Sequence, residues 1–92
     1  MVTTVSFVVS GRVQGVGFRY HTQNMAVQLC LAGWVRNRAD GDVEGILQGS
    51  SRDVEAMLAW LEKGPTYARV KQLRSDPIEG ETSLFESFQI TR

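Results

Sequence analysis

The 92-residue sequence contains little cysteine and has no excess charge of either sign. Its single cysteine, Cys30, cannot form an internal disulfide, which excludes the small secreted folds that disulfides hold together and favours a reducing, cytoplasmic location. Ten Lys and Arg residues balance ten Asp and Glu residues, so the protein has no general attraction for nucleic acid or anionic lipid. Any preference for an anion must therefore arise locally.

Long apolar runs are also missing, and no stretch is long enough to span a membrane. The opening residues MVTTVSFVVSGR contain no basic segment before their apolar part, so they predict a strand rather than a signal peptide. With 42% hydrophobic residues, the chain has enough apolar side chains for one core. We expect a single domain over residues 1–92 that needs no membrane partner.

Apolar periodicity predicts two helices after an initial strand. Alternation over residues 5–9 indicates the strand, and apolar residues three and four positions apart indicate a helix from Phe18 that ends near Gly33. A second helix is expected to begin after a cap at Ser50 or Ser51 and to end at Gly64-Pro65. Each helix thus follows a strand, as in a split βαβ unit.

Four further strands, joined in part by a turn and a loop, complete the pattern. Strands at 34–38 and 43–48 enclose Asp40-Gly41, a dipeptide suited to a tight hairpin. The segment 68–75 predicts a strand with an irregularity between Val70 and Leu73, because these two residues differ in parity. A polar loop over 76–83 and a last short strand, Phe88–Ile90, follow. The side chains of the 43–48 strand expected to face mostly water are Glu44, Ile46 and Gln48.

This order predicts an α/β (α+β) ferredoxin-like fold, a two-layer sandwich with β-α-β-β-α-β order and a short extra C-terminal strand. Two helices would cover one face of a largely antiparallel sheet. The last strand should run parallel to the first, which would bring the terminal carboxylate of Arg92 near the first helix start. We expect that carboxylate to hold the Arg19 guanidinium in position.

A glycine-rich turn, Gly11–Arg19, lies between the first strand and the first helix. Unpaired backbone N–H groups and the positive helix end favour an anion there, and Arg19 can bind a tetrahedral anion with two parallel hydrogen bonds. The glycine spacing matches neither the dinucleotide-binding fingerprint nor a P-loop. The turn therefore indicates a phosphate site without indicating a nucleotide.

The string GRVQGVGFR at 11–19, followed one helix later by GWVRN at 33–37, resembles acylphosphatase. The resemblance implies metal-free and cofactor-free hydrolysis of a small-molecule acyl phosphate by a monomer. It also implies that Arg19 binds the phosphate and that Asn37 orients the attacking water. The backbone donors implied for the phosphate are those of Gln14, Gly15, Val16, Gly17 and Phe18.

Elementary chemistry agrees with the absence of an acid/base pair. A departing carboxylate has a conjugate acid of pKa ~4 to 5, so it needs no general acid. Phosphoryl transfer depends mainly on positioning and on charge stabilisation, which backbone N–H groups and one arginine supply. Asn37 is no base at neutral pH, but its carbonyl can accept a hydrogen bond from water and orient it. A phosphate oxygen can then take up the proton.

Other conspicuous residues have plainer explanations. We expect His21 to lie on the surface and Cys30 to be a small packing residue, because neither has a catalytic or metal-binding partner nearby in sequence. Two tryptophans should cover the sheet and helix faces, and three arginines should add at most a weak positive field. These residues are Trp34, Trp60, Arg12, Arg36 and Arg38.

Two alternatives share the predicted element order. An RNA-recognition module would expose stacking aromatic residues on its central strands, whereas the strand at 43–48 exposes none. A module like that in hydrogenase-maturation carbamoyltransferases would be followed by Cys-x-x-Cys zinc motifs, which the sequence lacks. A free-standing enzyme that binds no nucleic acid is therefore favoured.

Overall fold

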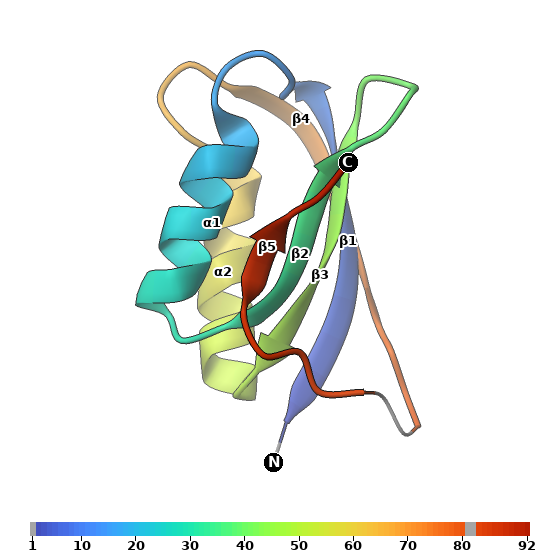
Figure 1. The fold of residues 1–92 in the computed structure, drawn as a ribbon. Coiled ribbons are helices and arrows are strands. Elements are labelled where there is room, and N and C mark those ends of the chain that lie inside the picture. The colour runs from blue at the N-terminus through green and yellow to red at the C-terminus, as the bar shows by residue number, and fades with distance from the viewer. Residues whose placement is uncertain (1, 81–82) are drawn as a thin grey trace.

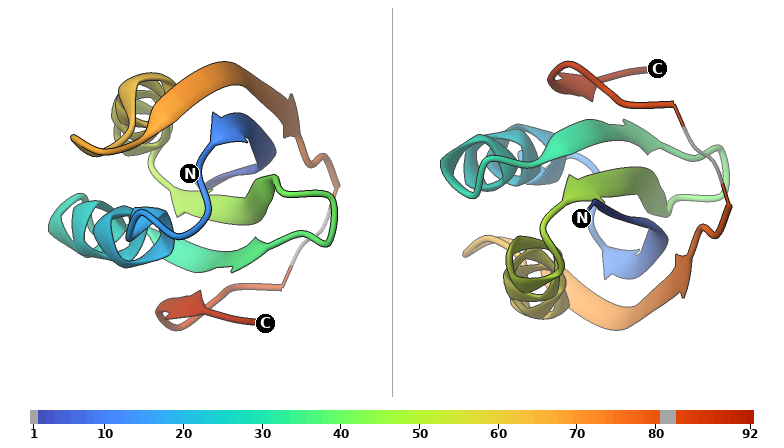
Figure 2. Two further views of the ribbon diagram at one scale, coloured as in Figure 1. Left: turned by 90° about the horizontal axis from the view of Figure 1, so that it is seen from above. Right: turned by 90° about the horizontal axis from the view of Figure 1, so that it is seen from below.

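The computed structural model describes residues 2–80 and 83–92, and within them two helices pack on one face of a five-stranded sheet (Figure 1). Figure 2 shows both helices on the same side, with β4 and β5 at opposite edges of the sheet. The elements are β1 (Thr3–Arg12), α1 (Phe18–Gln28), β2 (Ala32–Asn37), β3 (Val43–Gly49), α2 (Ser51–Lys63), β4 (Arg69–Pro77) and β5 (Phe88–Ile90). The predicted ferredoxin-like sandwich is confirmed.

Strand directions explain which ends of the elements meet. The sheet order is β4-β1-β3-β2-β5, in which β3 pairs antiparallel with both β1 and β2, and β5 pairs parallel with β2. Strands β1, β2 and β5 therefore run in one direction, as predicted for the first and last strands. Their C-terminal ends lie at the same end of the sheet as the start of α1 (Figure 1).

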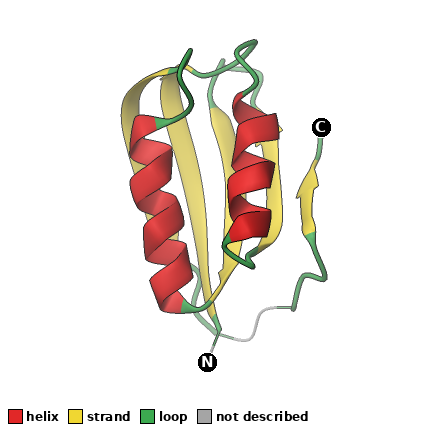
Figure 3. Cartoon of the chain, turned by 90° about the vertical axis from the view of Figure 1, so that its left-hand side faces the viewer, coloured by secondary structure: helices red, strands yellow, loops and turns green. Residues whose placement is uncertain are grey.

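The core lies between the sheet and the helices (Figure 3). Alternate β1 residues point into it, because successive side chains of a strand face opposite sides. Helix α2 buries three residues with helical spacing, and its Ser50 Oγ accepts a hydrogen bond from the Asp53 N–H at 3.2 Å. The largest fully buried side chains include Phe7, Phe18, Leu47, Met57 and Leu61.

Helix α1 ends earlier than the glycine pattern predicted. The Leu31 N–H donates to Ala26 O at 2.9 Å and the Cys30 N–H to Val27 O at 3.1 Å, a Schellman arrangement with Cys30 at φ +58°. Gly33 instead lies in β2, where a Cβ would sit 2.0 Å from Ile46 O. The expectation for Cys30 was also wrong, because this left-handed cap position leaves its side chain exposed rather than packed.

The open face of the sheet differs from prediction at one position. Gln48 was expected to face mostly water but is buried, with 3% of its surface exposed. Its amide donates to Thr4 Oγ1 at 3.1 Å and to Ser83 O at 3.0 Å, and its Oε1 accepts from the Phe85 N–H at 2.8 Å. The chain after β4 thus covers this residue, a contact that alternation within one strand does not reveal.

Strand β4 shows the predicted irregularity. Ser10 pairs with Gln72 but Gly11 pairs with Val70, so the register shifts by one residue between Val70 and Leu73. The strand extends to Pro77, into the start of the predicted loop over 76–83, and residues 81–82 of that loop lie outside the described residues. In the described ranges, none of the helices has the length and apolar character needed to cross a membrane.

Candidate active site

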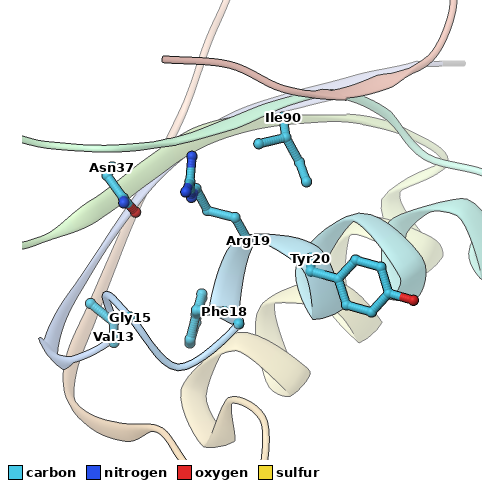
Figure 4. A pocket seen from close by; sticks show the side chains of 8 residues that line it. Val13, Gly15, Phe18, Arg19, Tyr20, Asn37 and Ile90 are labelled. Atoms are coloured by element: carbon cyan, nitrogen blue, oxygen red, sulfur yellow. The ribbon is translucent and has the colours of Figure 1, made fainter.

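Five of the seven predicted site residues meet in a cavity at the C-terminal end of β2. The cavity has a volume of about 190 Å³ and lies beside the turn after β1 and the start of α1 (Figure 4). Chain direction explains this meeting, since β1 leads into the turn and β2 ends at Asn37 on the same side of the sheet. The lining residues are Val13, Gly15, Gly17, Phe18, Arg19, Tyr20, Asn37 and Ile90.

The turn leaves the start of α1 open. Gly17 occupies the N-cap position at φ +76°, a left-handed conformation that glycine adopts without strain. Among the described residues, no side chain caps this end and no acidic residue stands in the first turn. The first backbone N–H groups and the positive end of the helix are therefore available to an anion in the cavity.

Arg19 projects from this first turn, and Figure 4 shows its guanidinium between Asn37 and Ile90. It takes part in none of the ion pairs formed by the described residues. By contrast, Arg36 Nε lies 2.7 Å from Glu44 Oε2, and Arg38 lies within 3.4 Å of acidic oxygens of Asp40 and Glu44. The charges of these two arginines are thus paired, whereas that of Arg19 is left for a ligand.

Asn37 contributes an unsatisfied acceptor. Its Oδ1 is buried and finds no hydrogen-bond partner in the described part of the chain. Figure 4 shows the Asn37 amide pointing into the same space as the Arg19 guanidinium. A buried carbonyl without a partner costs about 1 to 3 kcal/mol, so its position is best explained by a partner that enters the cavity. A water molecule can donate this bond.

Gln14 braces the site from outside the cavity. Its Nε2 donates to Arg38 O at 2.8 Å and to Asp42 O at 2.9 Å, which joins the glycine turn to the β2–β3 hairpin directly after Asn37. Within that hairpin the Asp42 N–H donates to Asp40 Oδ1, and this bond, with Arg38 nearby, lowers the pKa of Asp40. No pattern in the sequence predicts these two hydrogen bonds of Gln14.

Not every residue of the predicted phosphate loop lines the cavity. Gly15, Gly17 and Phe18 do, whereas Val16 is partly buried against the core and Gln14 makes the brace. Binding of phosphate by their backbone groups stays a prediction. Tyr20 and Ile90, in turn, line the cavity although the sequence analysis did not single them out. Only the register of β5 against β2 could have placed Ile90.

The chain end lies beside the site, as expected from the direction of β5. Arg92 lines an adjoining cavity together with Arg19, Asn37 and Ile90, and the Thr91 N–H continues the pairing with Val35 O at 2.8 Å. Arg92 forms no ion pair with Arg19 in the described part of the structure. Control of the Arg19 orientation by the terminal carboxylate thus stays a prediction. His21 is exposed, as expected.

Comparisons with known proteins agree with this geometry. The family model described as Acylphosphatase matches residues 5–90. An acylphosphatase of Nitrosococcus oceani is 48% identical over 87 residues, covering 94% of this chain and 98% of the relative. The crystal structure of an acylphosphatase from Bacillus subtilis has a TM-score of 0.92 at 33% identity, and the match covers 100% of both chains.

A larger protein shares the fold. A full-length HypF structure in the phosphate- and nucleotide-bound form has a TM-score of 0.87, and the match covers 100% of this chain but 12% of HypF. At 22% identity this likeness shows the fold alone. The acylphosphatases described above, by contrast, are covered over 98% and 100% of their length.

Proposed function

The chain belongs to the acylphosphatase family, and on that premise we propose that it hydrolyses acyl phosphates in the cavity around Arg19 and Asn37. The products are a carboxylate and inorganic phosphate. One observation carries the proposal: among the described residues, Arg19, which forms no ion pair, and Asn37, whose buried Oδ1 has no hydrogen-bond partner, line one cavity at an uncapped helix start.

Arg19 and the turn bind the phosphate. The planar guanidinium donates two parallel hydrogen bonds to phosphate oxygens, and the backbone N–H groups of residues 14–18 surround the others. The backbone donors of the turn are positioned before the substrate arrives, because Gly15 and Gly17 allow its left-handed conformations and Gln14 ties it to the β2–β3 hairpin. Donors fixed in advance stabilise the charge on the equatorial oxygens without reorganisation during the reaction.

Asn37 positions the nucleophile. Its Oδ1 accepts a hydrogen bond from water, which leaves a water lone pair directed at phosphorus. As the P–O bond to water forms, the bond to the acyl oxygen breaks and its electron pair leaves with the carboxylate. The water proton moves to a phosphate oxygen. No general acid is required, because a carboxylate with a conjugate-acid pKa of ~4 to 5 is a good leaving group.

The proposal includes the expected oligomeric state, the expected lack of cofactors and the expected location of the enzyme. The enzyme works as a monomer, without metal or organic cofactor, in the cytoplasm, where the exposed Cys30 stays reduced. Nucleic acid is not a partner, since the half-buried Glu44 and Ile46 of β3 are not stacking platforms.

Phosphate release from acetyl phosphate tests the proposal. We expect turnover with purified protein in the presence of excess EDTA at the same rate as without it. Loss of activity in EDTA that a divalent metal restores would contradict the metal-free mechanism. A protein that releases no phosphate from any acyl phosphate in a panel of aliphatic and aromatic substrates would contradict the function itself.

A further inference from the structure

Two apolar side chains line the active-site cavity, and the hydrolysis described above uses neither of them. Tyr20 is 59% exposed and Ile90 is 37% exposed, so neither is needed to close the core. Tyr20 follows Arg19 in the first turn of α1, and Ile90 ends β5. Exposed apolar residues at the mouth of a cavity are a common sign of a ligand contact.

The direction of the reaction determines where the acyl group lies. In phosphoryl transfer the attacking and leaving oxygens are roughly in line through phosphorus. If water approaches from Asn37, the leaving carboxylate must depart on the opposite side of the phosphate. Figure 4 shows the Arg19 guanidinium between Asn37 on one side and Ile90 on the other, with Tyr20 also beyond Arg19. The acyl group is therefore directed toward Tyr20 and Ile90.

We propose that Tyr20 and Ile90 form an acyl-binding subsite that favours acyl phosphates with an uncharged aromatic or aliphatic acyl group. This inference rests on the proposed function, because it takes the phosphate position and the water position from it. An aromatic ring and a branched aliphatic side chain offer apolar contact area and no charge to an acyl group.

The position of Ile90 is set by the pairing of its strand, and the Tyr20 ring contacts one neighbouring ring. The Tyr20 ring meets the His21 ring edge to face, with centroids 5.5 Å apart. Strand β5 is fixed on one side by parallel pairing with β2 and on the other by Gln23, whose Nε2 donates to Phe88 O at 3.0 Å. Ile90 is thus presented to the cavity by a strand that is tied to both β2 and α1.

The charges around the cavity explain why the acyl group should be uncharged. Arg19 is occupied by the phosphate, and Arg36 and Arg38 are paired with acidic side chains. In the cavity that Tyr20 and Ile90 line, Arg19 is the only charged side chain among the described residues, so a second carboxylate on the acyl group would lose hydration there without gaining an unpaired cation.

The test compares kcat/KM for benzoyl phosphate, acetyl phosphate and succinyl phosphate. In the parent protein we expect benzoyl phosphate to be the best of the three. In Tyr20→Ala and in Ile90→Ala, the ratio of kcat/KM for benzoyl to acetyl phosphate should fall about fivefold each, through KM rather than kcat. Tyr20→Phe keeps the ring and should retain the parent ratio. Inhibition by inorganic phosphate should stay within twofold in all of these variants.

Val27→Ala serves as the matched control, because Val27 is an exposed apolar residue of α1 that does not line the cavity. If Ile90→Ala loosens β5, its melting temperature drops and Tyr20→Ala alone decides the outcome. Equal losses on benzoyl and acetyl phosphate, an unchanged ratio, or a preference for succinyl phosphate would overturn the subsite. A parent protein that hydrolyses none of the three would instead refute the proposed function.

Discussion

The two helices of this small domain begin in opposite ways. Helix α2 is completed by its own sequence: Ser50 caps it through the Asp53 N–H, and Asp53 places a negative charge in its first turn. Helix α1 begins at Gly17, which has no side chain to cap it, and carries Arg19 rather than an acidic residue in the first turn. The first backbone N–H groups of any helix need an acceptor or an anion. In α2 the side chains of Ser50 and Asp53 provide them, whereas in α1 no side chain does so among the described residues.

The start of α2 therefore contributes to the stability of the fold, whereas the start of α1 stays available for binding. A capped start stabilises a helix by about 1 kcal/mol, so α1 forgoes part of its stability to keep its N–H groups free. The unpartnered Oδ1 of Asn37 is a second such cost at the same end of the molecule. Costs that gather at one end of a fold mark the place where a ligand completes the structure.

Replacement of Arg19 by lysine should have the largest effect. Arg19→Lys keeps the charge but loses the planar pair of donors, so we expect kcat/KM to fall roughly 100-fold or more and inhibition by inorganic phosphate to weaken. Steady-state kinetics with acetyl phosphate measure both. Arg36→Lys, at an arginine already paired with Glu44, is the control and should retain near-normal kinetics. Near-normal kinetics in Arg19→Lys would contradict its role.

An acidic residue at the start of α1 should imitate the bound anion. Gly17→Asp places a carboxylate at the uncapped end, where an added Cβ has its nearest contact at 3.5 Å, the His21 Cδ2 atom. Gly17→Asn is the matched control, since both side chains tolerate positive φ and have nearly the same shape. We expect Asp to reduce phosphate affinity about tenfold more than Asn does. Equal effects of both would show that no anion binds this helix end.

Removal of the Gln14 brace should affect turnover more than folding. Gln14→Ala deletes the two hydrogen bonds to the hairpin, so the glycine turn and Asn37 lose their fixed separation. We expect kcat to fall roughly tenfold, because small displacements of positioned groups slow the chemical step. The free energy of unfolding should fall by about 1 to 2 kcal/mol. Gln72→Ala, on the exposed face of β4, controls for loss of an amide and should change neither quantity.

The start of α2 should respond in the reverse manner. Ser50→Ala removes the cap and should lower the free energy of unfolding by about 1 kcal/mol, measured by urea denaturation. Its kcat and KM should equal those of the parent protein, because α2 lies outside the cavity. A loss of activity in Ser50→Ala at temperatures where the variant is folded would show that the two helix starts are not independent.

Local patterns predicted the fold, and the resemblance of two short strings to acylphosphatase predicted the two central site residues. Alternation in β1 and helical spacing in α2 are strong because each buries one face of a single element. Arg19 and Asn37 were found because each belongs to a short string of characteristic residues. The order of the elements then placed both at one end of the sheet, since β1 and β2 run in the same direction.

Contacts between distant segments account for what the sequence did not reveal. Gln48 is buried by residues 83–85, and Ile90 reaches the cavity only through the register of β5 on β2. The end of α1 was misjudged because Cys30 takes the left-handed position that glycine usually fills, while Gly33 is required by its close approach to β3. Glycine alone therefore indicates that a special backbone position exists nearby, not which residue occupies it.

The division of work between Arg19 and Asn37 is tested most directly by the affinity of the Asn37→Ala variant for inorganic phosphate, measured by calorimetry beside its turnover. Asn37 is proposed to orient water and to contribute little to the binding of a dianion, so kcat should fall roughly 100-fold or more while the phosphate Kd stays within about twofold. If the phosphate Kd rises in proportion to the loss of kcat, Asn37 binds the phosphate and the proposed mechanism is wrong.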